Sequence, residues 1–260
     1  MNLNDLSTQL MFTVVPIWTE NHDGSTSAAT AFLYNEPLAQ APEKSVPLLV
    51  TCRHVVVNAK RAVVEFVEGV DGKPVREKRV KAEIPGEFLK REMNEALDLA
   101  LVPMGPFLND LQAKGRAVFT RSVGPELVPK PEVVSDLSAM EEIVFFGFPS
   151  GLRDSHNAAP LIRRGITSTP VWNDLEGLPA FLIDAGVFPG SSGSPVFILN
   201  QGAYPTKSGL AIGNRVVFLG ILSEAVIRAR LGTETYLGLG RVIRSTEIRS
   251  AISAFALRIK

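Results

Sequence analysis

Short apolar runs separated by turn-forming residues make up most of this chain. Residues 48–51 are a continuous apolar stretch that predicts a buried strand, and residues 62–67 alternate apolar and polar positions. Asp71 and Gly72 form a hairpin turn signal between that segment and residues 74–84. Short strands with such turns between them are typical of barrels, so the pattern predicts an all-β fold.

A stretch with four prolines, residues 105–136, divides the chain into two halves of this kind. We interpret it as a connection that carries a short helix over residues 107–114. Residues 35–47 are too polar for a strand and are expected to form a loop. In the second half, strands are expected over residues 143–146, 161–169, 180–187, 196–199, 216–222 and 236–243.

At the end of the chain the apolar positions change to helical spacing, with Ser245 as a suitable N-cap. The residues on the apolar face are Ile248, Ala251, Ile252, Phe255 and Ile259. The expected organisation is a single unit over residues 1–260, with a first β-barrel over 8–104, the connection over 105–136, a second β-barrel over 137–244 and a C-terminal helix over 245–260.

Composition limits the classes of binding partner and the cellular compartment that we expect. The 27 Lys and Arg residues balance 27 Asp and Glu residues, and no basic run exists, so we expect neither a nucleic acid nor a membrane partner. Cys52 is the only cysteine, which excludes internal disulfides and fits a reducing compartment. No apolar run approaches about 18 residues, and the N-terminus does not resemble a signal peptide. We therefore expect a cytoplasmic protein.

The segment 188–196 contains the most informative chemistry, because it places Ser192 in a tight turn between Gly190 and Gly193. Glycine is favoured where the backbone takes positive φ or where another molecule approaches it closely. Such a turn leaves N–H groups free to point one way, as an oxyanion hole requires. A simple Gly/Ser/Pro hairpin loop would account for this segment equally well by itself.

Two further residues support the chemical interpretation. The chain has three histidines, and His54 follows directly on the apolar run over residues 48–51. Asp98 lies within an apolar segment, where a carboxylate is costly to bury unless it has a partner such as an imidazole N–H. The order His54, Asp98, Ser192 is the order of the chymotrypsin-like triad, whereas α/β-hydrolases run Ser, acid, His.

Three more segments carry a resemblance to a known family. Residues 183–195 resemble the motif DAA-x-x-PGNSGGP, residues 146–152 resemble G-x-P-x-G-L, and residues 164–168 resemble S-G-I-V-S. These are motifs of the trypsin-like serine peptidases of the chymotrypsin fold, and the pattern is most similar to the HtrA-like branch. The resemblance covers about residues 28–243 and implies two six-stranded antiparallel β-barrels with a C-terminal helix. No length remains for the PDZ module that many HtrA-like proteins append.

The resemblance implies a role for each residue of the triad. Ser192 would be the nucleophile, His54 the general base and then acid, and Asp98 the group that orients the imidazole. The backbone N–H groups of Gly190 and Ser192 would form the oxyanion hole. The chain departs from the family at Ser194, where glycine is usual; this also removes the nucleophile-elbow pattern of the α/β-hydrolases.

The resemblance also implies a primary specificity pocket, whose residues are assigned by their distance along the sequence from Ser192. This pocket contains no carboxylate at its base, unlike the pocket of trypsin. An uncharged pocket does not repay the desolvation of Lys or Arg, so small or aliphatic residues are expected before the scissile bond. The resemblance also implies a hydrogen bond from Ser223 near Asp98. The residues assigned to the pocket are Gly186, Val187, Ser223, Glu224, Ala225 and Gly238.

No metal and no cofactor are expected, since His156 has no metal-ligand partner at useful spacing and Cys52 is interpreted as a buried structural thiol. The expected partner is a polypeptide substrate, with restraint supplied by an activating protein or by homo-oligomer formation. Two alternatives stay open: a partner-gated or inactive chymotrypsin-fold regulatory protein, and an esterase-like serine hydrolase on an unrelated fold. The residue order and Ser194 count against the esterase.

Overall fold

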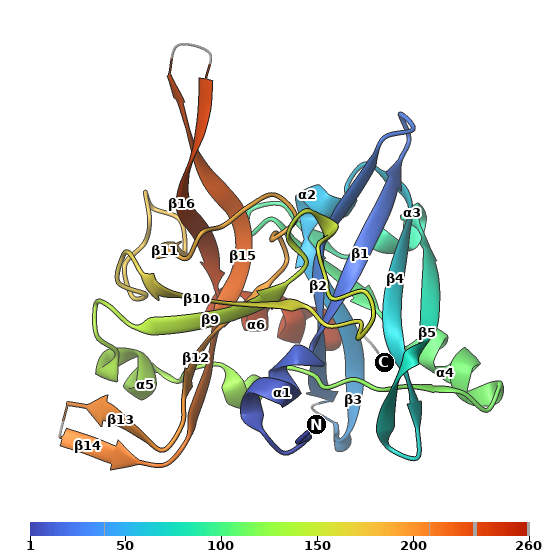
Figure 1. The fold of residues 1–260 in the computed structure, drawn as a ribbon, viewed down its shortest axis with the longest axis horizontal. Helices are drawn as coiled ribbons and strands as arrows, with labels where there is room; N and C mark the ends of the chain where they lie inside the picture. Colours follow the sequence, from blue (N-terminus) through green and yellow to red (C-terminus); the bar gives the residue numbers. More distant parts are fainter. Residues whose placement is uncertain (39, 208, 231–232, 259–260) are drawn as a thin grey trace.

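The computed structural model describes residues 1–38, 40–207, 209–230 and 233–258. Within these ranges strands predominate, and the chain forms two β halves that lie side by side (Figure 1). None of the helices in the described ranges has the length and apolar character needed to cross a membrane.

The first half is one eight-stranded sheet with the order β5-β4-β1-β2-β3-β7-β6, and β8 pairs with β4. This differs from the six-stranded barrel expected here, because the described residues show no pairing between the end strands β5 and β6. The chain passes between those two strands through helix α3 (Gly86–Leu89), and β6 is only two residues long. The strands are β1 (Val14–Asn21), β2 (Thr26–Leu38), β3 (Ala41–Cys52), β4 (Ala59–Val70), β5 (Lys73–Pro85), β6 (Met93–Asn94), β7 (Leu99–Pro103) and β8 (Ala117–Val118).

The loop predicted over residues 35–47 was wrong, because β2 and β3 continue through it as a hairpin. Backbone pairing joins Glu36 to Val46 and Pro37 to Ser45. Glu36 is buried because the C-terminal helix covers it, and Ser253 Oγ donates to Glu36 Oε1 at 2.8 Å. Glu43, Lys44 and Ser45 are exposed, so the polarity of this segment reflects a hairpin that faces solvent rather than a loop.

The second half is a closed barrel of six strands in the order β10-β11-β16-β15-β12-β9, as predicted. The strands are β9 (Glu142–Gly147), β10 (Leu161–Thr167), β11 (Ala180–Asp184), β12 (Pro195–Asn200), β15 (Arg215–Arg230) and β16 (Thr233–Arg244). The hairpin β15–β16 is much longer than expected and projects beyond the barrel as an arm (Figure 1). A separate hairpin, β13 (Ala203–Thr206) and β14 (Gly209–Ile212), lies at the opposite end.

Short helices fill the connections. The helix expected in the connection between the halves is α4, and the predicted C-terminal helix is α6, although Arg244 rather than Ser245 occupies its N-cap position. Besides α3, the helices are α1 (Leu6–Met11), α2 (Arg53–Val56), α4 (Gly105–Ala113), α5 (Pro131–Asp136) and α6 (Ser245–Ala256), with 3-10 turns η1 (Pro125–Leu127) and η2 (Pro149–Gly151).

A continuous apolar core joins the two halves. The Phe32 ring of β2 lies 5.4 Å from the Phe218 ring of β15, and Phe218 lies 5.5 Å from Phe197 of β12. Helix α6 packs against β15, β16 and β2, so it also contacts both halves. Because burial of apolar area is the main driving force for folding, the halves are expected to dock as one unit.

Candidate active site

His54 and Asp98 form a close pair on the first half. His54 lies in α2 directly after β3, and Asp98 lies directly before β7, which pairs with β3. His54 Nδ1 lies 2.6 Å from Asp98 Oδ2, and the His54 backbone N–H donates to Asp98 Oδ1 at 2.9 Å. Because a carboxylate only accepts hydrogen bonds, Nδ1 carries the proton and Nε2 of the neutral ring is an acceptor.

The backbone at Asp98 is held in an uncommon conformation. Its φ is +47°, in the left-handed region that non-glycine residues rarely adopt. The Arg53 N–H donates to Asp98 O at 2.8 Å, and the Asp98 N–H donates to Glu95 O at 3.2 Å. These bonds fix the carboxylate against the imidazole, and strain of this kind is typical of functional sites.

The turn that contains Ser192 lies on the second half and is bound through its carbonyl groups. Ser150 N–H donates to Pro189 O at 2.7 Å. Thr30 Oγ1 donates to Gly190 O at 3.2 Å, and Thr30 N–H donates to Ser192 O at 3.0 Å. Thr30 belongs to β2 of the first half, so the turn is fixed by both halves of the molecule.

The N–H groups of Gly190 and Ser192, on either side of Ser191, have no acceptor in the described part of the chain, and neither has that of Phe188 at the start of the turn. The N–H groups of Ser191, Gly193 and Ser194 donate instead to Phe188 O, Leu222 O and Ser191 O. In a trans peptide the N–H points opposite to the C=O, so the Gly190 N–H points away from Ser150. Gly190 and Ser192 therefore offer a pair of unused donors, as expected for an oxyanion hole.

Both glycines of the turn are required by its geometry. Gly190 has φ +84° and Gly193 has φ +91°, in the region that favours glycine. A Cβ at Gly190 would collide with the Ser150 N atom, and a Cβ at Gly193 would collide with Thr30 O. The glycines thus permit the close backbone approach that fixes the carbonyl groups.

Replacing Gly190 by alanine is expected to slow the reaction of Ser192 with a fluorophosphonate about 10²–10³-fold, because the turn must move and its donor is displaced. Gly24→Ala is the matched control, since Gly24 has φ +83° and no atom lies within 4 Å of its added Cβ. It should carry the same backbone strain without slowing the reaction. Similar labelling rates for the two variants would contradict the assigned role of Gly190.

His54, Asp98 and Ser192 line the same groove, which has a volume of about 620 Å³. No hydrogen bond joins Ser192 Oγ to His54 among the described residues. In proteins without a bound substrate such bonds are often long and form only in the complex. The sequence therefore identified three side chains that the fold brings to one groove.

The expected specificity pocket is only partly reproduced. Ser223, Glu224 and Ala225 line the groove, whereas Gly186, Val187 and Gly238 do not. Gly186 and Gly238 adjoin one another instead, because the Gly186 N–H donates to Gly238 O at 3.0 Å, and Val187 is buried.

The hydrogen bond implied for Ser223 was wrong. Its Oγ donates to Arg241 O on the neighbouring strand at 3.3 Å, not to Asp98. Glu224 is paired with the same residue, since its Oε1 lies 3.0 Å from Arg241 NH2. The two residues thus join the strand pair β15–β16 at the edge of the groove.

Sequence reasoning missed Thr30 and Ser150, which hold the turn. The Thr30 side chain also accepts from the Phe148 N–H at 2.9 Å, and its backbone O accepts from Thr51 Oγ1 at 2.8 Å. Thr30 and Gly190 are separated by 160 residues. No local pattern marks such a contact, because it joins residues of the two halves that are far apart along the chain.

Cys52 lies beside the pair, and its Sγ, a His54 ring nitrogen and an Asp98 oxygen lie within 4.8 Å of one another. Each of these groups has a protein partner: Cys52 Sγ donates to Leu222 O at 3.4 Å, and His54 is bonded to Asp98. Burial raises the pKa of the Cys52 thiol, and the nearby Asp98 charge adds to this rise. A metal would need the thiolate, which these conditions disfavour.

The raised pKa predicts that Cys52 is inert in the folded protein. The thiolate is the reactive species, so its fraction at neutral pH falls as the pKa rises. We expect no alkylation of the native protein by iodoacetamide at about pH 7.5, and complete alkylation in denaturant, as measured by intact mass. Rapid modification of the native chain would show that the thiol is accessible and ionised.

A comparison with known protein families identifies the family of this chain. The family model for the trypsin-like peptidase domain matches residues 29–203, which include Thr30, His54, Asp98 and Ser192. The chain belongs to the trypsin-like peptidase family. No curated protein matches the chain at a significant level.

Three solved structures share the fold at low sequence identity. The HtrA-type protease AlgW, solved with a tripeptide, has a TM-score of 0.54 at 14% identity, over 96% of this chain and 62% of that one. The serine endoprotease from Yersinia pestis has a TM-score of 0.55 at 13% identity, over 100% and 68%. An inactive form of Rv3671c from M. tuberculosis H37Rv has a TM-score of 0.51 at 16% identity, over 99% and 93%. The chain thus has the chymotrypsin-like fold and spans less than two thirds of AlgW.

Proposed function

We propose that the chain is a serine endopeptidase that hydrolyses peptide bonds through Ser192, His54 and Asp98. The observation that carries this proposal is the 2.6 Å contact between His54 Nδ1 and Asp98 Oδ2 in the groove that Ser192 also lines. The unused N–H groups of Gly190 and Ser192 support it, because they provide donors beside the nucleophile.

Acylation begins when Ser192 Oγ attacks the carbonyl carbon of the scissile bond. His54 Nε2 takes the hydroxyl proton, and Asp98 stabilises the imidazolium that results. The carbonyl oxygen becomes an oxyanion that accepts from the N–H groups of Gly190 and Ser192. The imidazolium then gives its proton to the leaving amine, the C–N bond breaks, and an acyl ester remains on Ser192.

Deacylation repeats these steps with water as the nucleophile. His54 Nε2 removes a proton from the water as its oxygen attacks the ester carbonyl. The second tetrahedral intermediate uses the same two N–H donors. The ester bond breaks, Ser192 Oγ regains its proton from His54, and the new carboxyl terminus leaves. Atoms and charges balance over the cycle, and no cofactor is required.

The surroundings of Gly186 support a preference against basic residues before the scissile bond. Arg163 NH2 would lie 3.0 Å from a Cβ on Gly186, and the Arg163 guanidinium stacks over the Phe188 ring at 4.9 Å. This cation would repel a Lys or Arg side chain at Gly186, the position that the offset from Ser192 implies for the base of the pocket, although Gly186 does not line the groove itself. Near Gly240 the space is filled by Val187 and Leu222, since a Cβ there would lie 2.6 Å from each. We therefore propose small or aliphatic residues at this position.

The lack of a Ser192–His54 hydrogen bond within the described residues favours one alternative. According to this alternative, the chain is a chymotrypsin-fold protein that becomes reactive only when an activating protein partner binds or when a homo-oligomer forms. The free chain would then hold the triad residues in one groove without turnover.

Labelling with a fluorophosphonate probe, followed by intact mass, tests the proposal. We expect the wild-type chain to gain one probe on Ser192. A folded chain that does not react would support the gated alternative, and a probe on another residue would contradict the assignment. Cleavage of a peptide library by the reactive chain would then test the preference against Lys and Arg.

A further inference from the structure

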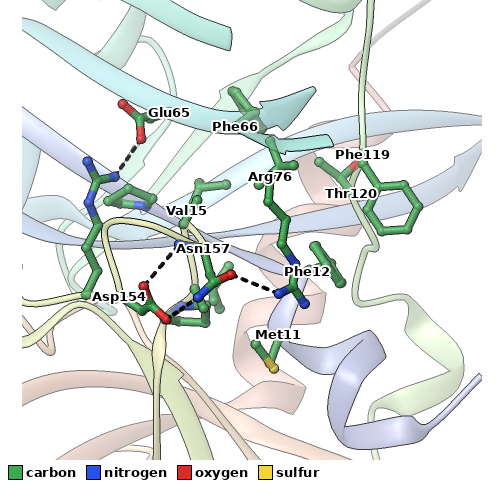
Figure 2. Close-up of a pocket in the computed structure, with 17 residues that line it drawn as sticks. Met11, Phe12, Val15, Glu65, Phe66, Arg76, Phe119, Thr120, Asp154 and Asn157 are labelled. Atoms are coloured by element: carbon green, nitrogen blue, oxygen red, sulfur yellow. Dashed lines mark hydrogen bonds and ion pairs between the residues drawn. The ribbon is translucent and has the colours of Figure 1, made fainter. Parts of the chain in front are cut away.

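A second cavity, of about 240 Å³, shares no lining residue with the active-site groove. It is enclosed by the region around α1 and β1, by β4 and β5, and by the loop over residues 153–160. Figure 2 shows that Val15, Phe66 and Phe119 form apolar walls, while Arg76 reaches in from β5 toward Asn157. The cavity thus combines an apolar interior with a cationic side chain.

The carboxylates at this cavity have partners within the chain. Glu65 is held by Arg153 NH1 at 2.6 Å and by Arg79 Nε at 3.6 Å. Asp154 accepts hydrogen bonds from the Asn157 backbone N–H and side-chain amide. Both carboxylates at the cavity are therefore already engaged.

Arg76 has only neutral partners among the described residues. Its NH1 donates to Asn157 Oδ1 at 3.0 Å, and its NH2 contacts Met1 Sδ at 2.9 Å. A guanidinium is always charged and offers a planar pair of donors that matches a carboxylate. An anionic group in the cavity would give Arg76 the partner that the chain does not supply.

We propose that this cavity binds a small carboxylate with an apolar body, and that the bound ligand favours the reactive geometry of the Ser192 turn. The carboxylate would pair with Arg76 while the apolar body lies among Val15, Phe66 and Phe119. The C-terminal residue of a peptide and a free short-chain acid share this chemistry. The effect on Ser192 rests on the proposed peptidase function, whereas the binding does not.

The loop that forms one wall of the cavity is joined to the active-site turn. Ser150 lies just before this loop, and both its N–H and its Oγ donate to Pro189 O, at 2.7 Å and 3.3 Å. Farther along, Arg79 NH2 donates to His156 O at 3.1 Å and so fixes the loop to β5. A ligand that binds the cavity in its observed shape stabilises this loop conformation, and with it the position of Pro189 and the Gly190 N–H.

Binding is tested on the Ser192→Ala variant, so that the result does not depend on any peptidase activity. The probes are N-acetyl-L-leucine, for a peptide C-terminus, and isocaproate, for a free acid; their primary amides are the controls. Isothermal titration calorimetry should show that one or both acids bind and that the amides bind at least about tenfold more weakly, as the loss of a charge-assisted hydrogen bond predicts. Whichever acid binds more tightly identifies the source.

Arg76→Gln should weaken acid binding by a similar factor, with its thermal melting temperature confirming that the variant is folded. Arg164→Gln is the matched control, because Arg164 lies on β10 and is already paired with Glu142. It should leave binding unchanged. Failure of both acids to bind, equal binding of acids and amides, or unchanged binding to Arg76→Gln would each overturn the site.

The link to the turn is tested by the rate at which wild-type Ser192 reacts with a fluorophosphonate. The acid that binds should raise this rate, and Arg76→Gln should abolish the increase. An unchanged or lower rate would overturn the link but not the binding. A chain that binds the acid in calorimetry but never reacts with the probe would contradict the proposed function and leave the binding site standing.

Discussion

Ser192→Ala and His54→Ala are each expected to lower turnover about 10⁶-fold, because a nucleophile and its base act as one unit. Removing Ser192 Oγ eliminates the attacking atom, and removing the imidazole leaves the hydroxyl without a proton acceptor. Neither change should lower the melting temperature much, since both side chains are at the groove rather than in the core. The measurement is peptide cleavage, or fluorophosphonate labelling for the wild type and both variants.

Ser191→Ala is the matched control for Ser192→Ala. Ser191 is the preceding residue of the same turn, but its Oγ is buried and has no hydrogen-bond partner among the described residues. Removing an unpartnered buried hydroxyl should be neutral or stabilising. The variant should therefore react like the wild type. If Ser191→Ala lost activity while Ser192→Ala kept it, the nucleophile would be misassigned.

Asp98→Asn is expected to lower turnover about 10⁴-fold through the tautomer of His54. One oxygen of Asp98 accepts from the His54 backbone N–H at 2.9 Å, and the other faces Nδ1 at 2.6 Å. An asparagine that keeps its oxygen on the backbone N–H presents its NH₂ group to Nδ1. The imidazole proton then moves to Nε2, which can no longer accept the proton of Ser192.

The control for Asp98→Asn is Glu95→Gln, which changes a carboxylate to an amide in the same groove. The Glu95 side chain is 83% exposed, and its carboxylate pairs with Arg53 at 3.5 Å. A loss of less than about threefold is expected for a surface pair of this kind. The NMR chemical shifts of the His54 ring nitrogens provide the second measurement, because they distinguish the two tautomers. An Asp98→Asn variant with the wild-type tautomer would contradict this mechanism even if it were slow.

The three side chains of the candidate site could be predicted from the sequence, because short motifs around each of them indicate its chemistry. A serine in a glycine-bracketed turn, an imidazole and an embedded carboxylate indicate acyl transfer much more specifically together than any of them does alone. The C-terminal helix was likewise marked by apolar residues at helical spacing, and the second barrel was implied by the resemblance to the trypsin-like family. Each of these predictions depends on residues close together in sequence or on an order of residues along the chain.

The parts that depend on long-range contacts could not be predicted. Residues 35–47 have the polarity of a loop because most of their polar side chains, such as Glu43 and Lys44, are exposed on a hairpin. Glu36 is the exception, since it is buried against Ser253, 217 residues away. Helix α3 connects β5 to β6 and so determines which strands of the first half lie beside each other. Strand propensity predicts that a segment forms a strand, but not which strand it pairs with. Ser223 was assigned by its offset from Ser192, yet in the fold it bonds to Arg241 O.

The role of Thr30 bears on when the protein becomes reactive during its synthesis. Thr30 leaves the ribosome early, whereas the turn that it holds, residues 188–194, is made much later. Until the two halves dock, the carbonyl groups of Gly190 and Ser192 lack the partners that fix them. If the proposed function holds, hydrolytic competence would be acquired only after the first half has docked onto the Ser192 turn, late in folding.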